Sequence, residues 1–175
     1  SADDSIHSNA NITIADGTYT LATGDDGVHA DDALIVNGGT ITVTESYEGL
    51  EGLAVTINDG TIDITASDDG INTAGEKMEL NGGYIHILAG GDGVDSNGDL
   101  TINGGEIYID GPSDNGNSAI DYGDRSSAYV NGGTLVAIGS SGMAEVMSDS
   151  SKQKVLMVKL GEQMEAGNVV LTDSE

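Results

Sequence analysis

Short runs in which polar and apolar residues alternate recur along most of the chain. Three of them are "TITVT" (40–44), "TIDIT" (61–65) and "YIHIL" (84–88). Alternation with a period of two places every second side chain on the same face of a β-strand. In these runs the aliphatic residues occupy one face, so that face is predicted to be buried. The chain shows no stretch with the 3.6-residue period of an amphipathic helix.

These strands belong to a repeat. "NGGT" or a close variant precedes most of them, and a conspicuous aliphatic residue follows an acidic turn in each repeat, at Ile6, Val28, Leu50, Ile71, Val94 and Ile120. One repeat of about 22 residues cannot bury its own apolar face, so successive repeats must stack. Residues 1–139 are therefore predicted to form an all-β, single-stranded parallel β-helix, or solenoid, of about six coils. We expect it to be right-handed, because parallel crossovers are right-handed by default.

Stacking also places equivalent residues in columns. An asparagine stands just before the glycine-rich corner in five repeats, at Asn37, Asn58, Asn81, Asn103 and Asn131. Side-chain amides stack well along such a column. We interpret these asparagines as a structural ladder.

The repeat pattern ends after residue 139. "KVLMVKL" (154–160) and "NVVL" (168–171) have the composition of strands. A bare coil end would expose both core and unpaired strand edges, so a solenoid needs a cover there. Residues 140–175 are predicted to be a small C-terminal β cap within the same domain.

The charge of the chain restricts its partners. The 175 residues include 30 Asp plus Glu but only 5 Lys plus Arg, which gives a formal net charge of −25. Such a charge argues against nucleic acid and anionic membrane as partners and favours cations. Cysteine is absent from the chain, which excludes disulfides and thiolate metal sites. No apolar run is long enough for a membrane span, so we expect no membrane insertion.

The acids concentrate in the turns, where stacking sets them in columns. One column precedes the turn glycine, and another follows the buried aliphatic residue, where His7 and His29 also stand. Carboxylates on neighbouring coils, about 5 Å apart, would repel by about 3 kcal/mol at an effective dielectric near 20. Two opposed calcium–oxygen bonds span about 4.8 Å, which matches the spacing of stacked strands, whereas magnesium prefers retained water and strict octahedral geometry. The candidate calcium ligands are Asp25, Asp26, Glu48, Glu51, Asp68, Asp69, Asn72, Asp92, Asp95 and Asp121.

The third repeat, "YEGLE" (47–51), carries longer acids than its neighbours. Glu48 and Glu51 reach one methylene further than aspartate, so we interpret this repeat as a bridge to the coils on either side. The alternative is that the acids are solvated turn residues, since Asp-Gly is a common turn pair. Five aligned turns with acids on both sides of the aliphatic residue favour calcium.

Five residues are candidates for contact with sugar rings: Tyr47, Tyr84, His86, Tyr108 and Tyr122. Flat rings beside polar neighbours are typical of carbohydrate-binding surfaces. The repeat places Tyr108 directly over His86 on adjacent coils, with Tyr84 nearby. The alternative, in which these rings only cover strand surface, stays open.

Several sequence segments resemble those of the carbohydrate-binding-domain family of secreted Gram-positive bacterial proteins. They include "DDGVHADDALIVNGGTITVT" (25–44), "SYEGLEG" (46–52), "ASDDGINTAG" (66–75) and "GDGVDSNGDLTINGG" (91–105). The resemblance implies a β-helix similar to that of polysaccharide lyases, with calcium between coils held by the "DDG" and "YEGLE" acids. It also implies a secreted or cell-surface location and binding of plant-type polysaccharide such as cellulose or pectin. Ser118 and Ala119 depart from the pattern, because they stand where other repeats have an acid and a glycine.

We therefore expect a non-catalytic, calcium-binding carbohydrate-binding module that recognises cellulose or pectin (polygalacturonate), as a monomer or as part of a larger multidomain secreted protein. A calcium-dependent polysaccharide (pectate) lyase is an alternative. It needs a base beside the uronate carboxylate, and only Lys77 and Arg125 supply a cationic side chain within the repeats. A calcium-stiffened structural or adhesin spacer is a third hypothesis, which predicts calcium binding without sugar affinity.

Overall fold

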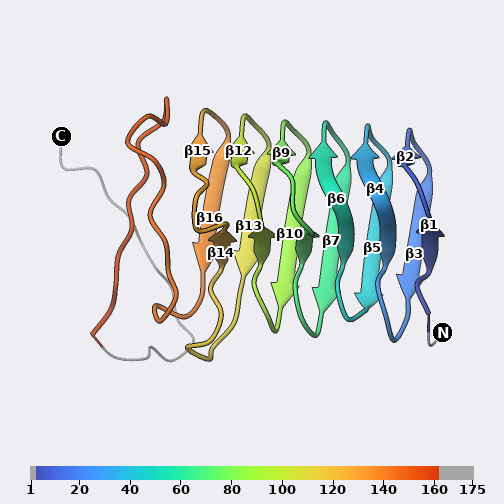
Figure 1. Ribbon diagram of the computed structural model, residues 1–175, viewed down its shortest axis with the longest axis horizontal. Helices are drawn as coiled ribbons and strands as arrows, with labels where there is room; N and C mark the ends of the chain where they lie inside the picture. The colour runs from blue at the N-terminus through green and yellow to red at the C-terminus, as the bar shows by residue number, and fades with distance from the viewer. Residues whose placement is uncertain (1–2, 162–175) are drawn as a thin grey trace.

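Two parallel β-sheets run along the stacked repeats and form the walls of a solenoid (Figure 1). The structure is a computed structural model that describes residues 3–161. The first sheet contains β1 (Ile6–Ser8), β2 (Ile12–Ile14), β4 (Val28–Val36), β6 (Leu50–Ile57), β8 (Ile71–Thr73), β9 (Met78–Leu80), β11 (Val94–Ser96), β12 (Leu100–Ile102), β14 (Ile120–Tyr122) and β15 (Ala128–Val130). The second sheet contains β3 (Thr18–Ala22), β5 (Thr40–Glu45), β7 (Thr61–Ala66), β10 (Tyr84–Ala89), β13 (Glu106–Asp110) and β16 (Thr134–Ile138).

The predicted all-β parallel solenoid is confirmed. The second sheet is six-stranded, in the order β16-β13-β10-β7-β5-β3, so each predicted repeat contributes one strand to it. The aliphatic residues that follow the acidic turns pair in one continuous register, Ile6–Val28–Leu50–Ile71–Val94–Ile120. Residues 3–161 contain no helix, and thus none that is long and apolar enough to cross a bilayer.

The core lies between the sheets and follows from the alternation of the sequence. Ile62 and Ile64 on β7 and Ile85 and Ile87 on β10 are completely buried. Burying one such side chain contributes about 1.5–3 kcal/mol relative to leaving it in water. The intervening residues point away from the core, and among them Asp63 is exposed. The same alternation therefore positions the outward-facing chemistry.

The corner between the two sheets is held by the predicted asparagine ladder. Each amide nitrogen donates to the side-chain oxygen of the asparagine on the preceding coil. The bonds run from Asn58 to Asn37 (2.8 Å), Asn81 to Asn58 (2.9 Å), Asn103 to Asn81 (2.8 Å) and Asn131 to Asn103 (2.9 Å). The following corner requires glycine, because Gly83 has a φ of +86° and an added Cβ would lie 2.6 Å from the carbonyl oxygen of Gly60.

The segment after β16 differs from the predicted cap. Residues 154–160 form no strand, and Leu156 and Val158 are exposed there. The outer edge of β15 is instead occupied by single hydrogen bonds from Ser148 N to Ala128 O (2.7 Å) and from Gln153 N to Val130 O (3.0 Å). Apolar residues form a strand only where they pair with a neighbouring strand, and none of the described strand pairs includes residues 154–160. The other predicted strand, 168–171, lies outside the described residues.

Candidate functional site

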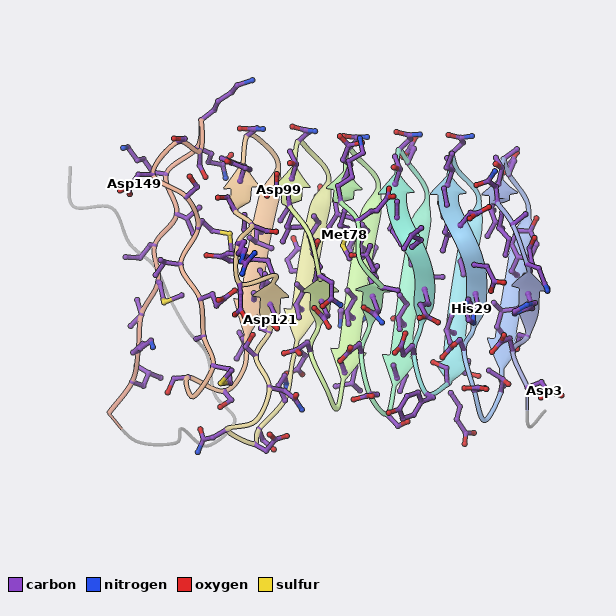
Figure 2. The ribbon with its side chains drawn as sticks, in the orientation of Figure 1. Asp3, His29, Met78, Asp99, Asp121 and Asp149 are labelled. Carbon is purple, nitrogen blue, oxygen red and sulfur yellow. The ribbon has the colours of Figure 1, made fainter. Side chains whose placement is uncertain are left out.

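The acidic turns lie side by side where the chain returns from the second sheet to the first. We define the acidic edge as residues 3–7, 25–29, 47–51, 68–72, 91–95 and 118–121. Within it, buried Val28 and its equivalents point into the core, so the next residue in each coil points outward. Those outward residues pair in the order His7–His29–Glu51–Asn72–Asp95–Asp121. Figure 2 shows His29 and Asp121 near opposite ends of this row.

Four aspartates at equivalent turn positions hold the coils together. In each, one carboxylate oxygen accepts a hydrogen bond from a backbone N–H of the next coil. The pairs are Asp26 N to Asp4 (3.1 Å), Glu48 N to Asp26 (3.1 Å), Asp92 N to Asp69 (2.7 Å) and Ser118 N to Asp92 (2.5 Å). These bonds use Oδ1 of each aspartate, so Oδ2 remains free of this contact. Ser118 therefore takes part through its backbone although it lacks the acid of the other repeats.

The first group of ligand-type side chains joins the first three coils. Oxygen atoms of Asp4, Asp25 and Asp26 lie within 4.8 Å of one another, as do ligand atoms of Asp26, His29 and Glu51. Burial raises the pKa of Asp26 above its ordinary value. Burial, followed by a hydrogen bond and repulsion from Asp26, raises the pKa of Glu51 to about 7. The folded chain therefore disfavours full ionisation of this group when no cation is bound.

Glu48 and Asn72 form the centre of the acidic edge. Glu48 Oε2 accepts a hydrogen bond from Asn72 Nδ2 at 3.0 Å. Burial is the main cause that raises the pKa of Glu48 to about 7, and repulsion from Glu51 and Asp26 adds to it. The other amide atom, Asn72 Oδ1, is buried without a hydrogen-bond partner. Buried polar atoms nearly always have a partner, so we expect a cation or a hydrogen-bond donor to contact this oxygen.

The second group lies on the fourth and fifth coils. Carboxylate oxygens of Asp69, Asp92 and Asp95 lie within 4.8 Å of one another. Burial, together with mutual repulsion, raises the pKa of Asp69 to about 7 and that of Asp95 to about 6. Asp121 on the last coil adds to the repulsion on Asp92 and Asp95. All the ligand atoms that this group offers to a cation are oxygens.

The structure brings most of the predicted ligands together but not all in one place. Asp25, Asp26 and Glu51 share the first group, and Asp69, Asp92 and Asp95 form the second. Asp68 instead accepts a hydrogen bond from Tyr47, which raises the pKa of Tyr47 to about 12. Sequence reasoning left Asp4 and His29 out of the ligand set, although both stand in the predicted columns.

Glu145 is a further carboxylate that the repeat could not reveal, because it lies in the segment after β16. It accepts a hydrogen bond from Tyr122 N at 3.2 Å. Burial raises the pKa of Glu145, with a further contribution from Asp121. The end of the acidic edge is therefore more negative than the repeats alone indicate.

Three of the five candidate sugar contacts share the outer face of the second sheet. Tyr108 pairs with His86 in register, as the repeat predicts. The rings of Tyr84 and Tyr108 lie 5.8 Å apart with their planes tilted by 42°. His86 Nδ1 lies 2.8 Å from Asp63 Oδ1 on the next strand. A shallow groove of about 600 Å³ runs beside Tyr84 and is lined by Asp59, Thr61, Glu106 and Thr134 with corner glycines.

The other two tyrosines lie elsewhere. Tyr47 is 49% exposed and belongs to the acidic edge. Tyr122 is on the first sheet, where its hydroxyl donates to Val146 O at 2.8 Å and thus binds the segment after β16. The five predicted sugar contacts therefore do not form one surface, and the Tyr84–Tyr108 face is the one that presents paired rings beside polar groups.

Comparison with known proteins identifies the family. Residues 25–173 match the family described as carbohydrate-binding domain-containing protein, which covers 149 of the 175 residues. No curated protein and no solved structure matches the chain. The match begins at the second coil and includes both ligand groups of the acidic edge apart from Asp4. Because the match covers most of its length, this chain belongs to the carbohydrate-binding domain-containing protein family.

Proposed function

We propose that this domain is a non-catalytic, calcium-loaded module that binds plant cell-wall type polysaccharide, either cellulose or polygalacturonate, in a secreted or cell-surface protein. Membership of the family supports carbohydrate as the ligand. The acidic edge supports calcium as the cation. The buried, unpartnered Asn72 Oδ1 is the observation that carries the calcium part.

The donor set fits calcium in its chemistry. Calcium takes six to eight oxygen ligands from carboxylates, carbonyl groups and water. Glu48 and Asn72 offer a carboxylate and an amide oxygen, and Asp69, Asp92 and Asp95 offer three carboxylates within 4.8 Å of one another. Bound calcium would balance the negative charge of these part-buried carboxylates. It would then stabilise the contact between adjacent coils, because it binds only where two coils are stacked.

The Tyr84–Tyr108 face is the proposed sugar contact. Aromatic faces contribute flat apolar area, and neighbouring polar groups provide hydrogen bonds that orient a ligand. Tyr84 is 41% exposed beside the groove, whose polar lining includes Asp59 and Glu106. This face lies on the second sheet, whereas the acidic edge consists of the starts of first-sheet strands and the turns that lead into them. Sugar contact and calcium binding therefore use different residues.

The net charge of the chain predicts a different calcium dependence of binding for the two polysaccharides. A chain of net charge −25 repels a polyanion such as polygalacturonate unless calcium bridges the two. Cellulose is neutral and meets no such repulsion. We therefore expect retention on polygalacturonate to require calcium and retention on cellulose to depend on it only weakly.

The test combines calorimetric titration of chelator-stripped protein with pull-down on both polysaccharides, with and without calcium. Replacing Tyr84 and Tyr108 together by alanine should weaken retention about thirtyfold, since two rings at about 1 kcal/mol each contribute about 2 kcal/mol. Tyr129→Ala, on the first sheet, is the control and should leave retention unchanged. Absence of calcium uptake would overturn the calcium part. Calcium uptake without retention on either material would favour a stiffened spacer instead.

A further inference from the structure

His29, labelled in Figure 2, occupies the one coil position of the acidic edge where a ring nitrogen lies within 3.4 Å of three carboxylates. Its Nδ1 lies 3.4 Å from Asp4 Oδ2, 3.4 Å from Asp26 Oδ2 and 3.3 Å from Glu51 Oε2. The three carboxylates come from three successive coils. The imidazole is therefore held at nearly equal distances from all three.

This geometry differs from that of an ordinary histidine ion pair. An N–H donor points at one acceptor, usually 2.7–3.2 Å away. His7 and His86 follow this rule, because their Nδ1 atoms lie 2.7 Å from Asp4 and 2.8 Å from Asp63. All three distances from His29 are longer than that range. The arrangement suits ligands that share a central ion, since tetrahedral bonds of 2.0–2.1 Å separate two ligands by about 3.3–3.4 Å.

The nitrogen selects the class of ion. Calcium is bound by oxygen atoms, whereas an imidazole nitrogen suits zinc and the neighbouring transition metals. We propose that His29, Asp26 and Glu51, with Asp4 as a further oxygen ligand, bind a divalent ion of the zinc class. Ligand atoms of His29, Asp26 and Glu51 lie within 4.8 Å of one another. The carboxylates are largely buried and the imidazole is 27% exposed, which leaves a path for the ion.

Neighbouring groups orient the ligands. His7 Nδ1 lies 2.7 Å from the same Asp4 oxygen that faces His29, and His7 Nε2 lies 3.0 Å from Asn9 Oδ1. Glu48 N donates to Asp26 Oδ1, so Oδ2 is the oxygen turned to His29. On the far side of the ring, Asp31 Oδ1 lies 3.6 Å from His29 Nε2. A metal-bound imidazole commonly directs its remaining N–H to such a carboxylate.

The zinc-class site goes beyond the proposed calcium site and does not rest on it. The two would share Asp26 and Glu51, so zinc would remove these carboxylates from calcium. The group of Asp69, Asp92 and Asp95 contains only oxygen ligands and remains available to calcium. Substitutions at His29 and at Asp92 therefore test the two proposals separately.

The experiment titrates zinc into the chelator-stripped 175-residue chain in the presence of excess calcium, and repeats the titration with Co²⁺ to record its visible absorption. The wild type should bind zinc with a nitrogen ligand in spite of the calcium. His29→Gln should weaken zinc binding by about 100-fold or more, because loss of even an outer-shell partner of a metal ligand costs about 10–100-fold. His86→Gln is the matched control and should bind zinc as the wild type does. Asp92→Asn should weaken calcium binding and leave zinc binding unchanged.

A second substitution, His29→Asp, replaces the nitrogen by oxygen and keeps a ligand at that position. It should reduce the preference for zinc over calcium even when the fold, followed by far-UV circular dichroism, is intact. Zinc binding no tighter than that of calcium would overturn the proposal. So would equal zinc binding by His29→Gln and wild type, or an equal loss in His86→Gln.

Discussion

Glu48→Gln should stabilise the metal-free domain at high pH, although it alters a residue at the centre of the acidic edge. Burial raises the pKa of Glu48 to about 7, from an ordinary value of 4.5. Folding therefore favours the protonated acid and is opposed by the carboxylate. Glutamine has a similar shape and keeps an oxygen that can accept the hydrogen bond from Asn72, but it carries no charge to bury.

The pKa values fix the sign and the size of the effect. Below pH 4.5 the acid is protonated in both states, and folding carries no penalty from it. Between pH 4.5 and about 7 only the unfolded chain ionises, so stability falls, and above pH 7 the penalty is complete. The difference corresponds to about 3 kcal/mol at most. Because Glu48 is only part-buried, solvent screening reduces this figure to about 1–2 kcal/mol.

Urea unfolding followed by circular dichroism, in the presence of a chelator, measures this effect at pH 5 and pH 8. At pH 5 only about a quarter of the penalty has developed, so Glu48→Gln should gain much less there than at pH 8. Glu45→Gln changes an exposed glutamate at the end of β5 and should have little effect at either pH. A gain of equal size at both pH values, or a loss at pH 8, would refute the view that the acidic edge is strained by its own charge.

Two matched pairs of substitutions test the stability of the solenoid that carries the site, both by urea unfolding. Asn81→Ala removes hydrogen bonds to Asn58 and Asn103 and should cost about 2 kcal/mol, whereas Asn131→Ala removes only the bond to Asn103 and should cost about half as much. Equal losses would contradict a ladder of additive bonds. Gly70→Ala places a Cβ against the side chain of Ile87 and 2.5 Å from Gly93 O, and should cost about 3 kcal/mol. Gly75→Ala, whose Cβ comes no closer than 3.7 Å to Leu53, should cost much less, and a similar loss at both positions would show that crowding is not the cause.

The fold could be predicted from the sequence because its determinants are local and periodic. Alternation fixes which side chains face the core, and the repeat length fixes which residue lies above which, as with Tyr108 over His86. The same reasoning was wrong for residues 154–160, where apolar residues occur without pairing to a strand. Whether a segment outside the repeats pairs with a strand depends on tertiary contacts, which the local sequence pattern does not contain.

For the site, the sequence predicted which residues stand in the same column but not which of their side chains converge. The register places Glu51 beside His29, but whether their ligand atoms converge depends on side-chain torsions and on which oxygen a backbone N–H has already taken. Asp4 and His29 were thus visible as column members and not as ligands. Glu145 comes from outside the repeat and reaches the acidic edge only through the fold.

The stacking of coils has a mechanical consequence. Among the strands of residues 3–161, each strand of the second sheet bonds only to the strands of the adjacent coils, and bonded positions are typically 22 residues apart in sequence. A force that pulls on one terminus while the sheet face is held on a polymer surface would detach coils in sequence from that end. Each rupture would release about 70–80 Å of chain, at 3.3–3.6 Å per residue. An ion bound between two coils would make the two coils detach together. The number of bound ions would therefore set how much chain is released at each rupture.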